Sequence, residues 1–203
     1  MMDLIIESVK KIEELLEHSG SMDAGVLLDV DPDTVICHFE RGTTMSATFG
    51  GKSTDFATYD PIRAHTKASF MFGAPMDTPP VRGAACAIIN VVLGFLCMSR
   101  ILHSCPESCH ASCRDQMGKE IAGKRLCCIG TLGAVSSELC KDVTDDPANA
   151  DIILINGEGI IVMGTGDIIG NYKSSKRIIC VGPSTAGVAR LHEIEHWCPF
   201  GKH

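Results

Sequence analysis

Three cysteines stand four positions apart in the stretch HSCPESCHASCRDQM, residues 103–117. Cys105, Cys109 and Cys113 have polar neighbours, among them His110, so their thiols have access to a cation. A regular helix rises about 1.5 Å per residue, which would place the first and third thiols about 12 Å apart. A straight helix therefore allows two of these thiolates on one ion, whereas an irregular loop allows three on one ion or on an iron–sulfur cluster. We predict that the three cysteines are ligands of zinc, iron or such a cluster.

A second group of metal-ligand residues lies near the C-terminus, in the tail LHEIEHWCPFGKH. His192 and His196 are four positions apart, the spacing at which two imidazoles chelate from one helical turn, and Cys198 follows directly. We expect these residues to complete the cysteine site from the same or another subunit.

The chain has 11 cysteines and no secretory signal pattern, which indicates a reducing cytoplasm. Clustered thiols in that compartment bind metals or do redox chemistry more often than they form disulfides. Cysteines within apolar runs are expected to be small core residues; these are Cys37, Cys86, Cys97, Cys127, Cys128 and Cys180.

Charge and hydropathy limit the range of partners. The formal net charge is −7, and there is no basic stripe, so we expect no nucleic-acid partner. The uncharged run 83–99 is shorter than the roughly 20 residues of a membrane span and contains Asn90, which predicts a buried helix and no membrane partner. The expected partners are a small molecule or metal and further copies of the chain in a homo-oligomer.

The first hundred residues have the pattern of an α+β lobe. Apolar residues recur at helical spacing from Leu4 to Leu16, and Gly20 ends that helix. The runs AGVLLDV, DTVICHFE and TTMSATFGG predict an antiparallel meander, and ASFMF a further strand. The apolar helix around Asn90 closes the lobe.

The last eighty residues have a different pattern. RLCCIG, ADIILIN and RIICVG are apolar runs, each followed by glycine or a glycine-rich turn and a helix-compatible stretch, which is typical of βα units on a parallel sheet. The sequence predicts an α/β protein in which a small antiparallel α+β front lobe packs on a Rossmann-like back lobe. The expected division is residues 1–100, a cysteine-rich linker 101–122, and residues 123–203.

Ligands of open parallel sheets bind at the C-terminal ends of the strands, where loops present free N–H groups. Neighbouring parallel strands would bring three such loops together around an anionic or nucleotide-like ligand. Their candidate binding residues are Gly130, Thr131, Gly133, Asn156, Gly157, Gly182, Pro183, Ser184 and Thr185. Asp145 is the candidate acceptor for ribose hydroxyls.

The segments GKRLCCIGTLG, DDPANADIILINGEGIIVMGTGDII and RIICVGPST resemble the heavy-metal chelation proteins, a family of unknown function. AACAIINVVLG is similar to a helix of that family and puts Asn90 in correspondence with its asparagine. The resemblance implies a small enolase-N-terminal-like front lobe, a Rossmann-like C-terminal lobe, and a cleft between them lined by Asn90 and the three loops. The cysteine stretch and the tail lie outside the family's pattern.

Three functions are compatible with these patterns. The first is a cytoplasmic protein that binds a metal or a metallo-cofactor. The second is a small-molecule enzyme such as an S-adenosylmethionine-dependent methyltransferase, with Gly130, Gly133 and Asp145 holding the nucleoside. The third is a non-catalytic iron–sulfur or redox-partner subunit. The sequence shows no Ser/His/Asp arrangement, and Glu158 is the one carboxylate considered as a general base.

Overall fold

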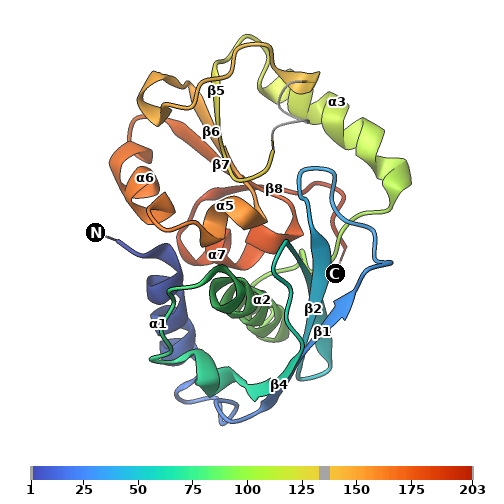
Figure 1. Ribbon diagram of the computed structural model, residues 1–203, viewed down its shortest axis with the longest axis vertical. Coiled ribbons are helices and arrows are strands. Elements are labelled where there is room, and N and C mark those ends of the chain that lie inside the picture. Colours follow the sequence, from blue (N-terminus) through green and yellow to red (C-terminus); the bar gives the residue numbers. More distant parts are fainter. Residues whose placement is uncertain (1, 133–137, 203) are drawn as a thin grey trace.

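The computed structural model describes residues 2–132 and 138–202, and Gly133 lies outside them. Two four-stranded sheets and their helices make up the described chain (Figure 1). The helices are α1 (Leu4–Leu16), α2 (Pro79–Phe95), α3 (His110–Glu120), α5 (Gly157–Ile161), α6 (Thr165–Tyr172) and α7 (Ala186–Leu191). The strands are β1 (Gly25–Asp31), β2 (Thr43–Phe49), β3 (Lys52–Thr58), β4 (Ala64–Lys67), β5 (Leu126–Ile129), β6 (Ile152–Ile155), β7 (Arg177–Val181) and β8 (Glu195–Trp197).

The front sheet is antiparallel, in the order β3-β2-β1-β4. Its tightest connection is the Gly50–Gly51 hairpin, where both residues have positive φ, +56° and +78°, as a type I′ turn requires. Two expected strands are wrong. The segment DTVICHFE leaves the sheet as a loop, and ASFMF forms a 3₁₀ turn at Ala68–Met71.

The back sheet is parallel throughout, in the order β5-β6-β7-β8. The strands predicted from RLCCIG, ADIILIN and RIICVG pair in chain order, so the predicted α/β architecture is confirmed. Between β5 and β6, Val143 forms a single parallel bridge with Leu126.

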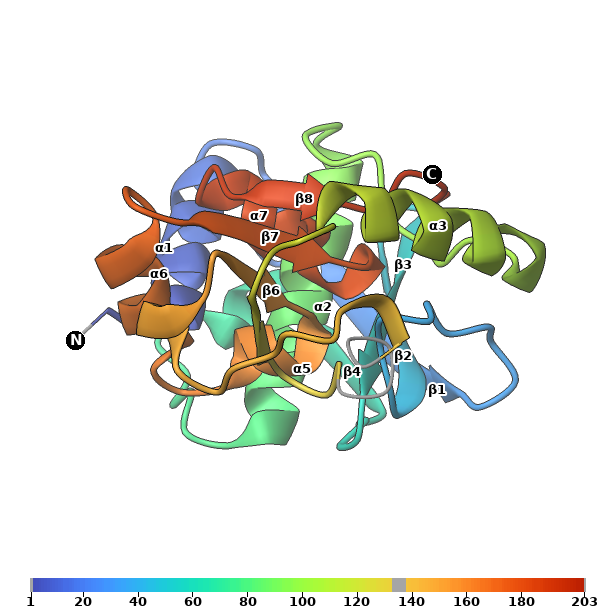
Figure 2. The ribbon, with the colours of Figure 1, turned by 90° about the horizontal axis from the view of Figure 1, so that it is seen from above.

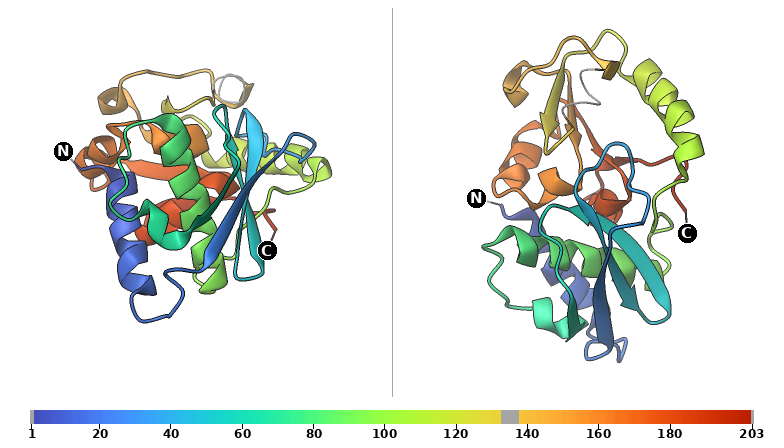
Figure 3. Two further views of the ribbon diagram at one scale, coloured as in Figure 1. Left: turned by 60° about the horizontal axis from the view of Figure 1, so that its bottom comes forward. Right: turned by 45° about the vertical axis from the view of Figure 1, so that its right-hand side comes forward.

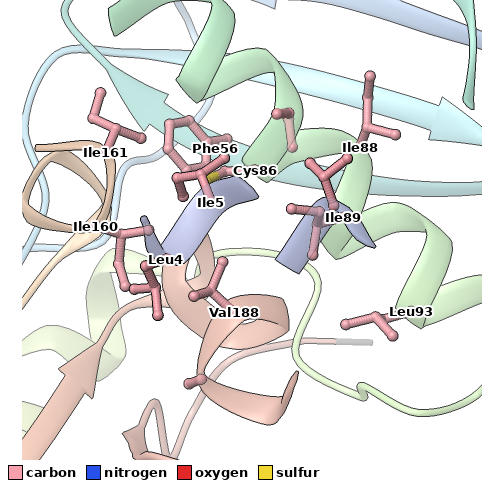
Figure 4. Packing of buried hydrophobic residues seen from close by; sticks show 14 of the residues in the cluster. Leu4, Ile5, Phe56, Cys86, Ile88, Ile89, Leu93, Ile160, Ile161 and Val188 are labelled. Carbon is pink, nitrogen blue, oxygen red and sulfur yellow. The ribbon is translucent and has the colours of Figure 1, made fainter. Parts of the chain in front are cut away.

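Helix α2 joins the two lobes through one continuous core. It contacts β2 and β3 on one side and α1, α5 and α7 on the other. Pro79 and Pro80 suit its first turn, and every residue from Arg82 to Gly94 is buried. Figure 4 shows Phe56 of the front sheet, Ile89 of α2 and Val188 of α7 packed in the same cluster. None of the helices in the described ranges is both long and apolar enough to cross a membrane.

The cysteine-rich segment, expected as a linker, packs against the front sheet and the C-terminal tail. Leu102 O accepts bonds from Asp55 N at 2.9 Å and from Thr54 Oγ1 at 2.8 Å, so this segment runs along the free edge of β3. His103 forms an antiparallel bridge with Lys202. Helix α3 follows, on the side of the molecule opposite α1 and α6 (Figure 2).

Candidate functional site

The loops that follow β5, β6 and β7 meet at one edge of the back sheet. A side chain at Gly130, where φ is +95°, would collide with Asn156 and Gly159. A Cβ on Gly157 would lie 2.6 Å from Ser184 Cβ. Residues from all three predicted loops are therefore in contact. Thr131 and Asp145 are exposed, and the predicted Gly133 lies outside the described residues.

The polar groups at this edge bind to the front lobe and to α2. Asn156 Nδ2 donates to Phe39 O at 3.1 Å, while its Oδ1 accepts from Gly159 N at 2.9 Å and caps α5. Ser184 Oγ accepts from Ala57 N of β3 at 2.9 Å.

Asn90 holds the next turn of this edge from α2. Its Nδ2 donates to Ser184 O at 2.9 Å, and its Oδ1 accepts from Gly187 N at 2.8 Å. Pro183 and Thr185 are buried beside it. The segments that the family resemblance places around a cleft are thus bonded directly to each other. We call the following residues the strand-end edge: Asn90, Asn156, Gly157, Gly182, Pro183, Ser184 and Thr185.

Glu40 is buried in the middle of this edge and was not singled out in the sequence. It comes from the loop after β1, which reaches up to the back sheet in Figure 1. Its Oε1 accepts from Ser184 N at 3.1 Å, while Oε2 is buried and has no partner in the described chain. Burial raises the pKa of Glu40 to about 8; the Ser184 bonds oppose this rise, and the nearby Asp55 and Glu158 add to it.

Four thiols from three distant parts of the chain lie near one another, and two of them, those of Cys37 and Cys198, also lie near Glu40. They belong to Cys37 of the same loop, Cys105, Cys113 of α3, and Cys198. Burial is the largest cause that raises the pKa of each thiol. Electrostatic repulsion adds to it, because Cys198 is close enough to Cys37, Cys105 and Cys113 for each charge to disfavour the others.

The predicted cysteine triplet is only partly helical. Cys105 precedes the helix, Cys109 is at its N-cap and Cys113 lies in its first turn. The irregular start brings Cys105 and Cys109 near enough to raise the pKa of Cys113 together. The indole N–H of Trp197 faces the thiol of Cys113 and lowers that pKa, although its geometry is too poor for a full hydrogen bond.

Two imidazoles extend the group of thiols. The rings of His38 and His110 meet edge-on with their centres 4.8 Å apart. Both ring nitrogens of His38 and Nε2 of His110 are buried without a partner among the residues described. Burial, and to a smaller extent the nearby charges of His110, Arg114 and Arg41, lower the pKa of His38 to about 4. At neutral pH the ring is therefore neutral, with a proton on one of its two nitrogens.

The two histidines of the tail are in other surroundings. His192 Nε2 lies 2.9 Å from Ser8 Oγ of α1, away from α3 (Figure 2). His196 lies near the back-sheet edge, where its Nε2 is 2.8 Å from Gly182 O. Of the three predicted tail ligands, the structure brings Cys198 to the other cysteines and leaves His192 apart. Cys37, His38 and Glu40 were not predicted as site residues, although the spacing Cys-His-x-Glu was visible in the sequence.

We call Cys37, His38, Cys105, Cys109, His110, Cys113 and Cys198 the soft-ligand cluster. It lies between the loop after β1, α3 and the C-terminal tail, which meet on one side of the molecule (Figure 3). Within residues 2–132 and 138–202, no three Cys, His, Asp or Glu side chains are already placed to hold one metal ion. Binding a metal here would require the side chains to move.

No family model matches the sequence, and no curated protein matches it either. Among solved structures, the chain is similar to a protein of unknown function from the DUF364 family of Pyrococcus horikoshii. The two share 18% sequence identity with a TM-score of 0.45, over 89% of this chain and 79% of that one. The similarity is one of fold.

Proposed function

We propose that the protein binds a thiophilic transition metal, zinc or iron, at the soft-ligand cluster. The observation that carries the proposal is the convergence of five thiols and two imidazoles from segments far apart in the sequence. Sulfur and imidazole nitrogen are the ligands that zinc and iron take in proteins. The family resemblance through the back lobe points the same way, because that family is named for heavy-metal chelation.

The buried imidazole nitrogens of His38 and His110 that have no partner in the described chain are the atoms whose arrangement fits a metal ion best. Two imidazoles that bind one zinc at about 2.0 Å have ring centres about 5 Å apart. The rings of His38 and His110 are 4.8 Å apart, and their buried nitrogens have no other partner in the described chain. Buried polar atoms left without partners cost stability, and a bound cation would remove that cost.

The thiols supply the remaining ligands. Cys109 adjoins His110 in the chain, and Cys37 adjoins His38, so a shift of either segment moves an imidazole and a thiol together. Metal binding requires each ligating thiol to lose its proton, and burial opposes this until the cation is present. The proposal includes the expectation of a reducing cytoplasm, which keeps the thiols free to bind.

Metal analysis of protein purified anaerobically in reductant tests the proposal. The parent is titrated with cobalt(II), whose thiolate complexes absorb in the near ultraviolet, and zinc and iron are measured directly. We expect about one equivalent of metal in the parent and loss of the absorption band in a Cys105→Ser/Cys113→Ser variant. A visible colour on iron reconstitution would indicate a cluster.

The matched control is Cys97→Ser/Cys140→Ser, which removes two thiols that lie outside the cluster. It should bind cobalt as the parent does, with circular dichroism showing that both variants are folded. An unchanged cobalt spectrum in the Cys105→Ser/Cys113→Ser variant contradicts the proposal, as does a reduced parent that binds no metal.

Methyl transfer from S-adenosylmethionine and a non-catalytic iron–sulfur or redox-partner role stay predictions, as does the homo-oligomer. The nucleoside site would use Gly130, Gly133 and Asp145; Gly130 lies next to the strand-end edge, whose own polar groups bind the front lobe and α2. Metal binding is preferred because three buried imidazole nitrogens without a partner in the described chain, both of His38 and Nε2 of His110, lie in the cluster. Equilibrium dialysis with S-adenosylmethionine separates the first two functions.

A further inference from the structure

A serine, a histidine and an aspartate meet on the outer face of the front sheet. His103 Nδ1 lies 3.1 Å from Asp55 Oδ1, and its Nε2 lies 3.4 Å from Ser53 Oγ. Ser53 and Asp55 are two positions apart on β3, so their side chains point to the same face. His103 is fifty positions further on, which is why the sequence does not show the arrangement.

We propose that Ser53, His103 and Asp55 form a nucleophilic site that hydrolyses small esters. In such a site the serine attacks, the histidine takes and returns the proton, and the carboxylate fixes the tautomer of the histidine. His103 matches these roles, because its Nδ1 faces the carboxylate of Asp55 and its Nε2 faces the hydroxyl of Ser53. A serine-to-base distance of 3.4 Å is within the looser range of sites without substrate.

The backbone holds the base and the carboxylate in place. His103 N donates to Lys202 O at 3.1 Å, and Lys202 N donates to His103 O at 3.0 Å. Asp55 accepts a second bond, from Ser104 N to Oδ2 at 3.3 Å, and its side chain is 13% exposed. Ser53 itself is exposed, so an acyl group reaches its hydroxyl from solvent.

The edge position of β3 also supplies an oxyanion donor. The N–H groups of Asp55 and Ala57 point away from β2, to Leu102 O and to Ser184 Oγ. Because N–H directions alternate along a strand, the N–H of Ser53 points to the same free edge. The backbone N–H of the attacking serine is one of the two donors that stabilise the tetrahedral intermediate in serine hydrolases.

The reaction balances without a further reactant except water. Ser53 Oγ bonds to the ester carbonyl carbon as His103 Nε2 takes its proton, and the leaving alkoxide or phenolate departs with that proton. Water then attacks the acyl–serine ester, His103 accepts a proton from it, and Ser53 Oγ regains a proton as the carboxylic acid leaves.

Hydrolysis of p-nitrophenyl acetate by the full chain tests the site, with Ser53→Ala as the variant. We expect at least a 100-fold loss of the rate above buffer, the range that acid–base and nucleophilic groups contribute. The control is Ser46→Ala, which changes the serine paired with Asp55 on the adjacent strand and should keep the parent rate. A fluorophosphonate probe should label Ser53 in the parent, as read by mass spectrometry.

Asp55 is a positioning residue, so it needs a different test. Asp55→Ala should lower kcat with little change in KM, and Asp55→Glu should restore part of the kcat, because a carboxylate again reaches the imidazole. A parent that neither hydrolyses the ester nor takes the label overturns the proposal, as does a Ser53→Ala variant with the parent rate.

Discussion

The strand-end edge and the soft-ligand cluster lie side by side, and the loop after β1 contacts the edge and forms part of the cluster. They differ in whether their buried polar atoms have hydrogen-bond partners. At the edge, Asn156 and Ser184 bind main-chain groups of the front lobe. In the cluster, both ring nitrogens of His38 and Nε2 of His110 are buried with no partner in the described chain. Groups that satisfy each other fix two lobes in one arrangement, whereas groups left unsatisfied lower stability and are available to a ligand.

Glu40 lies between the two regions and should have the largest effect on stability. Its pKa is about 8 in the folded protein and near 4.5 when unfolded, so the folded state binds the proton more tightly. The free energy of unfolding should therefore fall as pH rises from about 4.5 to about 8, and the loss is complete above pH 8. Each unit of pKa difference corresponds to about 1.4 kcal/mol, so the total is several kcal/mol.

Glu40→Gln should remove this dependence, because the amide stays neutral and still accepts from Ser184 N. We expect parent and variant to be similar at pH 5 and the variant to be more stable by several kcal/mol at pH 9, as measured by urea unfolding. Glu14→Gln, at an exposed position of α1, is the control. Parallel pH profiles for parent and Glu40→Gln would show that Glu40 is not held neutral.

Gly182→Ala should destabilise the strand-end edge itself. Gly182 has φ +84° and ψ 164°, a conformation that is almost confined to glycine. A Cβ there would also lie 2.5 Å from Glu40 Oε1. Strain and collision together should cost about 3 kcal/mol in urea unfolding.

Gly51→Ala is the matched control, since Gly51 also has positive φ but nothing lies within 4 Å of its Cβ. Its cost should be about 1 kcal/mol. Equal losses for the two substitutions would mean that the contact between Gly182 and Glu40 does not hold the lobes together.

Metal binding should stabilise the protein through the cluster alone. Zinc at a free concentration 100-fold above its Kd should add about 2.7 kcal/mol to the free energy of unfolding. The Cys105→Ser/Cys113→Ser variant should gain nothing, and Cys97→Ser/Cys140→Ser should gain as much as the parent. Thermal unfolding with and without zinc measures this, and an equal zinc effect in all three proteins would place the metal elsewhere.

The sequence was sufficient for elements whose pattern is local. The three apolar runs that became β5, β6 and β7 were predicted with their parallel pairing, because each is short, apolar and followed by a turn. DTVICHFE had an equally strand-like pattern but became a loop. Its backbone and side chains are bonded to Asn156 and Ser184, more than a hundred positions away, and no local pattern reports such a contact.

The candidate sites show the same limit. Cysteine spacing identified Cys105, Cys109 and Cys113 as possible ligands, while Cys37 had the apolar neighbours of a core residue. Cys37 is indeed buried, but its neighbours include Cys105, Cys198 and Glu40. Sequence patterns thus predicted burial, and the partners followed from the tertiary fold.

The smallest expected change in stability is that of His38→Phe, a substitution that tests the role of His38 both in stability and in metal binding. His38→Phe replaces a ring with two buried, unpartnered nitrogens by an apolar ring of similar shape. Without metal, the variant should be more stable by about 1 kcal/mol, because an unsatisfied buried polar group costs 1–3 kcal/mol and the larger ring offsets part of this gain. The variant should also lose the stabilisation by zinc, because it lacks the imidazole ligand.

The control is His65→Phe, at an exposed position of β4, which should change neither the stability nor the zinc effect. Urea unfolding in chelator and then in zinc measures both. A variant that is less stable in chelator would show that the nitrogens of His38 are satisfied by water, and one that keeps the full zinc effect would remove His38 from the site and leave the metal to the thiols.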